Sequence, residues 1–75
     1  MDEVLEILES LNLDADVSSC EDLVDGGFLG SLDIVTIIAE LSDAFDITIP
    51  AREIIPANFN SARALWNMVQ RLQED

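Results

Sequence analysis

The sequence predicts an all-α protein, a small four-helix bundle with three main helices and one short helix. Apolar residues recur at helical spacing in three segments, and no two segments alternate in the way that paired strands would. Apolar residues make up 49% of the chain, too large a share for a disordered acidic protein, so a compact core is expected. At a length of 75 residues we expect one domain, spanning residues 1–75.

The first helix is expected from about Asp2 to Leu11. Asp2 and Glu3 lie in its first turn, where negative charge complements the helix dipole. Its apolar residues fall at helical spacing between acidic positions, at Val4, Leu5, Ile7, Leu8 and Leu11.

A long loop should follow, from Asn12 to Gly30. Loops of this length are usually either functional or disordered. Apolar residues spaced through the loop favour an ordered path tethered across the helices, and these are Leu13, Val17, Leu23, Phe28 and Leu29.

The second helix is expected from Ser31 to Phe45. Its apolar residues are more numerous than one helix face can hold. The predicted core stripe consists of Ile34, Ile37, Ile38, Leu41 and Phe45. A neighbouring apolar face is left over, formed by Leu32, Val35 and Ala39. It is flanked by Asp33, Thr36, Glu40 and Asp43. An apolar strip rimmed by acids indicates a docking surface for a basic, partly apolar partner. The alternative is that burial in the bundle simply reaches further round this helix.

The last third of the chain should hold one short and one long helix. Residues 46–50 are expected to be extended, because a proline disfavours helix at the residue before it. Pro50 suits the start of a short helical turn through Ile55, which Pro56 should end. Asn60 or Ser61 should cap the last helix, which runs to about Gln73. Its apolar face comprises Ala62, Leu65, Trp66, Val69 and Leu72.

The net charge of −13 sets the expected partners. Sixteen acids against three arginines should repel nucleic acid and anionic membrane surfaces, and attract proteins with basic patches. The charge is also consistent with a role in solubility alone.

The start of the chain has no basic region, and no apolar stretch approaches the ~20 residues of a membrane span. With a lone cysteine, Cys20, these features favour a cytoplasmic protein, which we expect to be a monomer.

The residue types argue against an enzyme. The chain has no His, Lys or Tyr, so no conventional base is present to activate a serine nucleophile. The loop from Asp14 to Asp25 partly matches an EF-hand in its oxygen ligands, but Ser19 replaces the glycine of the turn and Asp25 replaces the bidentate Glu. We therefore expect no metal site, beyond loose binding of divalent cations to this acidic loop.

Ser31 is the strongest candidate for a functional residue. It stands where a glycine-rich loop meets the second helix, with its hydroxyl at the positive end of that helix. A phosphate attached there would be stabilised by the dipole and by the free amides of the first turn. A small acidic domain that displays one such serine is typical of a substrate of enzymes.

Two segments resemble the acyl/peptidyl carrier protein family. They are residues 25–35 (DGGFLGSLDIV) and residues 40–50 (ELSDAFDITIP). The family pattern is Asp-Ser-Leu-Asp at the start of a long acidic helix that ends in Phe-x-Ile-x-Ile-Pro, and the likeness covers essentially the whole chain. It implies an acyl-carrier-like bundle with 4′-phosphopantetheine on Ser31, attached from coenzyme A by a phosphopantetheinyl transferase. The terminal thiol of that group would hold an acyl or aminoacyl group as a thioester.

The resemblance also implies where partner enzymes bind. Family members meet their enzymes at the positions of Leu32, Asp33, Val35, Ala39, Glu40 and Asp43. The expected partners are the transferase and an acyl- or aminoacyl-adenylating ligase or synthase with a basic docking patch. The chain is similar to free-standing carriers, including the D-alanyl carriers. Gly30 replaces the Asp that usually precedes the serine, which keeps a second hypothesis open: an acidic helical adaptor without a prosthetic group.

Overall fold

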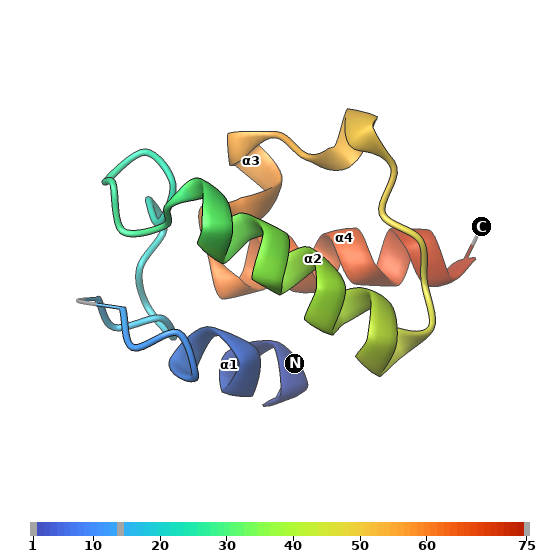
Figure 1. Cartoon of the computed structure of the whole chain (residues 1–75), viewed down its shortest axis with the longest axis horizontal. Helices are drawn as coiled ribbons and strands as arrows, with labels where there is room; N and C mark the ends of the chain where they lie inside the picture. Colours follow the sequence, from blue (N-terminus) through green and yellow to red (C-terminus); the bar gives the residue numbers. More distant parts are fainter. Residues whose placement is uncertain (1, 14, 75) are drawn as a thin grey trace.

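The protein is a helical bundle, as the sequence predicts. The computed structural model describes residues 2–13 and 15–74, and within these ranges it contains no strand. Its elements are α1 (Asp2–Glu9), α2 (Ser31–Phe45), a 3₁₀ helix (Ala51–Glu53), α3 (Pro56–Phe59) and α4 (Ala62–Glu74). Figure 1 shows α2 crossing in front of α4, with α1 below and α3 above. None of the described helices has the length and apolar character needed to cross a membrane.

One hydrophobic core joins the helices and the long loop. α1 packs against α2 and α4, and α3 packs against α4. Within residues 2–13 and 15–74 no polar or charged side chain is buried, so all of the charge described there lies at the surface. The buried residues are Val4, Leu8, Val17, Leu23, Leu29, Ile37, Leu41, Ile49, Phe59, Ala62, Leu65, Met68 and Val69.

α1 ends at Glu9, two residues before the predicted end. The amides of Leu11 and Asn12 bond to carbonyls three residues back, at 3.2 Å each, instead of four. Asn12 then adopts a left-handed conformation with φ of 55°, which asparagine tolerates better than most residues. The tightened last turn and the left-handed residue together stop the helix early.

α2 has the predicted bounds but buries a narrower stripe than predicted. Only Ile37 and Leu41 are buried, whereas Ile34, Ile38 and Phe45 are half-buried. Phe45 packs its ring against Trp66 of α4, with centroids 5.9 Å apart and a tilted geometry that suits aromatic pairs. This pair ties the carboxyl end of α2 to α4.

The prediction that Pro56 ends a helical turn was wrong. The short turn is the 3₁₀ helix, which stops at Glu53, and Pro56 instead begins α3. A proline fits the first helical position because the N–H that it lacks would have no partner there. Ile54 and Ile55 therefore lie between two short helices, and both are exposed.

α4 begins after Ser61 and runs to Glu74. Of the two predicted caps, Ser61 is the one used: its Oγ accepts the N–H of Ala64 at 3.0 Å. The buried face includes Met68, which the sequence analysis omitted, while Trp66 and Leu72 are half-buried. The side chain of Asn60 is left free to make contacts elsewhere.

Candidate functional site

Ser31 is the first residue of α2 and is exposed. Gly30 before it has an extended backbone, with φ of −90° and ψ of 174°, and its carbonyl accepts the N–H of Ile34 at 3.1 Å. The chain therefore changes abruptly from extended to helical at this serine. The first amides of an α-helix have no partner within the helix, so the Ser31 hydroxyl lies at the positive end of the α2 dipole.

The Asp33 side chain caps the first residues of α2. Its Oδ2 accepts the N–H of Gly30 at 3.0 Å. Because glycine has no side chain to return a bond, only one half of a capping box is formed. The Asp33 side chain is half-buried. Its carboxylate therefore stabilises the start of the helix, whereas Glu40 and Asp43 further along α2 are exposed.

The other serine hydroxyls are engaged or less accessible. Those of Ser10 and Ser18 donate to Ile7 O and Asp16 Oδ1, and that of Ser61 accepts its capping bond. The pKa of Asp16 is lowered by the Ser18 hydroxyl first, then by the Ser18 N–H and the Ser19 hydroxyl. Ser42 is half-buried. Within residues 2–13 and 15–74 the Ser31 hydroxyl makes no hydrogen bond, so among the serines it combines exposure with freedom from local partners.

An exposed apolar face runs along α2 from Ser31. Leu32 is 81% exposed and Val35 is 61% exposed, and Ala39 lies beside them. Glu40 and Asp43 are also exposed, and α2 carries no Lys or Arg. The alternative in which burial reaches round the helix to these residues is therefore wrong. Of the six residues predicted to contact partners, five are exposed on α2 and Asp33 is half-buried.

Ile54 and Ile55 are two further exposed apolar residues outside α2, which the sequence did not single out. They are 40% and 46% exposed, and they line an apolar cavity of about 70 Å³ with Ile34, Phe59 and neighbouring residues. Ile55 is extended, as a residue before proline should be. Ile54 instead caps the end of the 3₁₀ helix with φ of −85° and ψ of 74°, so the two isoleucines follow no regular alternation that the sequence could have revealed.

An ion pair holds the Ile54–Ile55 segment in place. Arg71 Nη1 of α4 lies 2.9 Å from Glu53 Oε1. Asn58 Nδ2 donates to the carbonyl of Glu53 at 2.7 Å and to its Oε1 at 3.1 Å. These bonds fasten both ends of the segment to each other and to α4.

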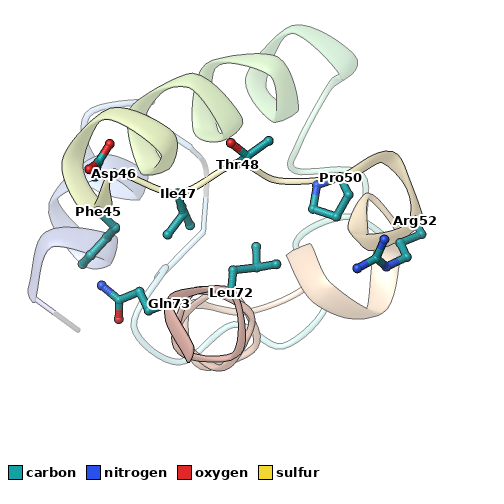
Figure 2. A pocket seen from close by; sticks show the side chains of 8 residues that line it. All are labelled: Phe45, Asp46, Ile47, Thr48, Pro50, Arg52, Leu72 and Gln73. Carbon is teal, nitrogen blue, oxygen red and sulfur yellow. The ribbon is translucent and has the colours of Figure 1, made fainter. Parts of the chain in front are cut away.

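A second hollow lies at the opposite end of α2 and is separate from Ser31. Figure 2 shows Leu72 and Gln73 of α4 facing Phe45 and Ile47 across an open groove of about 640 Å³. At 1.5 Å per residue, α2 separates this end from Ser31 by about 20 Å. Asp46 and Arg52 supply the charges of the groove, and no serine lines it. The groove therefore does not belong to the serine site.

Cys20 and the acidic loop offer no competing chemistry. The Cys20 thiol donates to Asp22 Oδ1 at 3.1 Å. The Asp22 N–H lowers the pKa of this thiol, but the bond to its carboxylate, desolvation and the charges of Asp22 and Asp16 outweigh that effect, so the pKa is raised. The described part of the chain contains no cluster of three metal-ligating side chains. Asp14, the first ligand of the partial EF-hand pattern, lies outside the described residues.

Comparisons with known proteins show which family the chain resembles. Residues 2–69 match the family model described as a phosphopantetheine attachment site. The chain is 46% identical to aminoacyl carrier protein 1 of Bradyrhizobium diazoefficiens over 63 residues, which is 84% of this chain and 69% of that protein. It is 40% identical to the D-alanyl carrier protein of Streptococcus sanguinis and 38% identical to that of Streptococcus mutans, each over 95% of this chain and 91% of the relative. No solved structure shows a significant match.

Proposed function

The chain belongs to the phosphopantetheine-binding carrier protein family, and from that premise we propose that Ser31 is the residue that carries the 4′-phosphopantetheine group. The function of the chain is that of a carrier, and the covalent prosthetic group supplies the thiol that holds an acyl or aminoacyl group as a thioester. Members of this family are generally not catalysts. We extend this to the present chain, and we further propose that residues 1–75 act as one carrier domain and as a cytoplasmic monomer.

One observation carries the assignment of Ser31. Its hydroxyl is exposed, free of hydrogen bonds to the described residues, and located at the first position of a fifteen-residue helix. Attachment forms a bond between Ser31 Oγ and phosphorus and breaks the pyrophosphate P–O bond of coenzyme A. The hydroxyl proton is lost and the nucleotide part departs. The free amides and the dipole at the start of α2 stabilise the negative phosphodiester that results.

Intact mass measurement tests this assignment. After incubation with coenzyme A and a broad-specificity transferase, the wild-type protein should gain one phosphopantetheine group and Ser31→Ala should gain none. Ser19→Ala, which removes a hydroxyl from the loop, should be modified like the wild type. Modification of Ser31→Ala would assign the group to another residue. A wild-type protein that stays unmodified would favour the adaptor without a prosthetic group.

We propose an aminoacyl group as the cargo. The relatives named above are an aminoacyl carrier and two D-alanyl carriers. The apolar cavity beside Ile34 and Phe59, of about 70 Å³, supports a small cargo. A cavity of this size holds only a handful of water molecules, which favours a small cargo over a long acyl chain.

Loading Ser31 with defined groups tests the cargo. We expect an alanyl group and an octanoyl group, each attached with its pantetheine arm, to leave the methyl NMR signals of Ile34, Ile54 and Ile55 equally unperturbed, because neither enters the cavity. Ile7 of α1, far along the chain from the site, serves as the reference signal. Shifts at the three isoleucines with the octanoyl group alone would mean that the cavity opens for acyl chains, against an aminoacyl specialisation.

The acids of α2 should govern association with partner enzymes. We propose that Leu32, Asp33, Val35, Ala39, Glu40 and Asp43 bind the transferase and an adenylating ligase or synthase through basic patches on those enzymes. Leu32 and Val35 would supply apolar contact, while the charges accelerate encounter. Asp33 differs from the other two acids because it also caps Gly30. Glu40 and Asp43 are therefore the acids whose charge can be changed without disturbing the start of the helix.

Charge reversal on α2 tests this electrostatic contribution. We expect Glu40→Lys with Asp43→Lys to slow association with the transferase at low salt, and the difference from wild type to shrink as salt screens it beyond ~8–10 Å. The matched control is Glu3→Lys with Glu6→Lys on α1, which changes the net charge equally at another surface. Stopped-flow association rates are the measurement. Equal slowing by both pairs would assign the effect to net charge and not to α2.

Gly30 is the position where this chain departs from the family pattern. Gly30 is the N-cap of α2, its φ is negative, and an added Cβ would meet only Asp33 Oδ2, at an ordinary 3.8 Å. Gly30→Asp should raise the rate of Ser31 modification several-fold by restoring the usual carboxylate. Its effect on the melting temperature should be small, because a capping gain of a few tenths of a kcal/mol is opposed by the nearby Asp33 charge.

Gly30→Asn is the control for this substitution, because it adds a capping side chain without charge. Modification rates and melting temperatures of the three proteins should be measured together. If the Asn variant is accelerated as much as the Asp variant, the cap is responsible and not the carboxylate. If neither variant is accelerated, glycine at position 30 is fully functional.

A further inference from the structure

We propose that Asn60 is a positioning residue that holds the loop before Ser31 and thereby sets the rate at which Ser31 is modified. This inference rests on the proposed role of Ser31. Asn60 lies between α3 and α4, whereas Ser31 begins α2, so the sequence separation hides any relation between them. Hydrogen bonds connect the two regions in the folded protein.

The Asn60 side chain uses both of its polar atoms on the loop. Its Oδ1 accepts the N–H groups of Val24 and Asp25, each at 3.0 Å. Its Nδ2 donates to Asp25 Oδ2, also at 3.0 Å. Two amides facing Oδ1 and a carboxylate facing Nδ2 determine which way the side-chain amide points. The backbone carbonyl of Asn60 adds a bond from the N–H of Leu23 at 2.9 Å. One residue therefore fastens three consecutive loop residues.

A short loop, closed by hydrogen bonds, connects Ser31 with the residues that Asn60 binds. The carbonyl of Leu23 accepts the N–H groups of both Phe28 and Leu29, each at 2.9 Å, so the loop returns to its starting point. Leu23 and Leu29 are buried, which anchors both ends of the loop in the core. Gly30 follows Leu29 directly, and Ser31 follows Gly30. A shift of Leu23 would therefore be transmitted to the residues immediately before the serine.

The contacts of Asn60 point to positioning and not to capping. Ser61 caps α4, and Asn58 bonds to Glu53, so the neighbouring polar side chains have separate tasks. The amide of Asp25 is at an exposed site and that of Val24 is partly buried. If the Asn60 side chain is removed, water can replace part of the hydrogen bonding of these two amides. The substitution should therefore loosen the loop more than it destabilises the core.

A swap of donor and acceptor across the contact tests the proposal. Asn60→Asp removes the donor and places two carboxylates together, so kcat/KM for Ser31 modification should fall roughly tenfold, within the range that small displacements of a reacting group produce. Asp25→Asn keeps an acceptor for Asn60 Nδ2 and should stay close to wild type. The double variant re-forms the bond in reverse, with the position-25 amide donating to the position-60 carboxylate. It should regain most of the lost rate.

A stability-matched control separates positioning from loss of fold. Leu72→Ala removes half-buried apolar contact from the far end of α4, more than 40 positions along the chain from the serine. At a temperature where both proteins are folded, Ser31 should be modified more slowly in Asn60→Ala than in Leu72→Ala. It should also show faster hydrogen exchange at the amides of Val24 and Asp25. Equal modification rates for these two variants, or a double variant as slow as Asn60→Asp, would overturn the proposal. An unmodified wild-type protein would instead overturn the role of Ser31, and this inference with it.

Discussion

Only a narrow stripe of α2 enters the core, and the arrangement of the candidate site follows from that restriction. Ile37 and Leu41 are the α2 residues that are fully buried, beneath α1 and α4. Because burial stops there, Leu32 and Val35 stay outside although both are strongly apolar. Leaving them exposed forgoes about 1.5–3 kcal/mol of burial free energy for each side chain. That cost is intelligible if a partner protein covers this face.

The long loop is ordered because it is held both by apolar burial and by hydrogen bonds. Val17, Leu23 and Leu29 enter the core at intervals, so no long stretch of the loop is without an anchor. Burial fixes where the loop crosses the helices, but it does not fix the path of the backbone between anchors. Asn60 and the Leu23 carbonyl supply that second constraint through directed bonds. A glycine-rich segment can then precede Ser31 without leaving the serine loosely placed.

Charge and apolar surface are arranged so that they do not compete. The acids on the exposed side of α2 have no basic neighbour on that helix, whereas Arg71 of α4 pairs with Glu53 of the 3₁₀ helix. That pair and Asn58 hold Ile54 and Ile55 beside Ile34 of α2. The exposed apolar residues of α2 are therefore flanked by acids that have no basic partner on that helix, which suits recognition by basic enzymes.

The sequence by itself determined the helical class, the bounds of α2 and the place of Ser31, because these depend on local signals: apolar spacing, the glycine before the helix and proline near its end. It also predicted that Leu32, Val35 and Ala39 share a face, since helix geometry alone decides that. The bond between Asp33 and Gly30 and the start of α3 at Pro56 also follow local rules for helix starts, although the sequence analysis did not apply them. Only the tertiary structure decided that Ile54 and Ile55 stay exposed. The contact between Asn60 and the loop was equally out of reach, because it joins residues 35 and 36 positions apart. Spacing along the chain reports which residues share a helix face, but bonds between distant segments depend on how the helices pack.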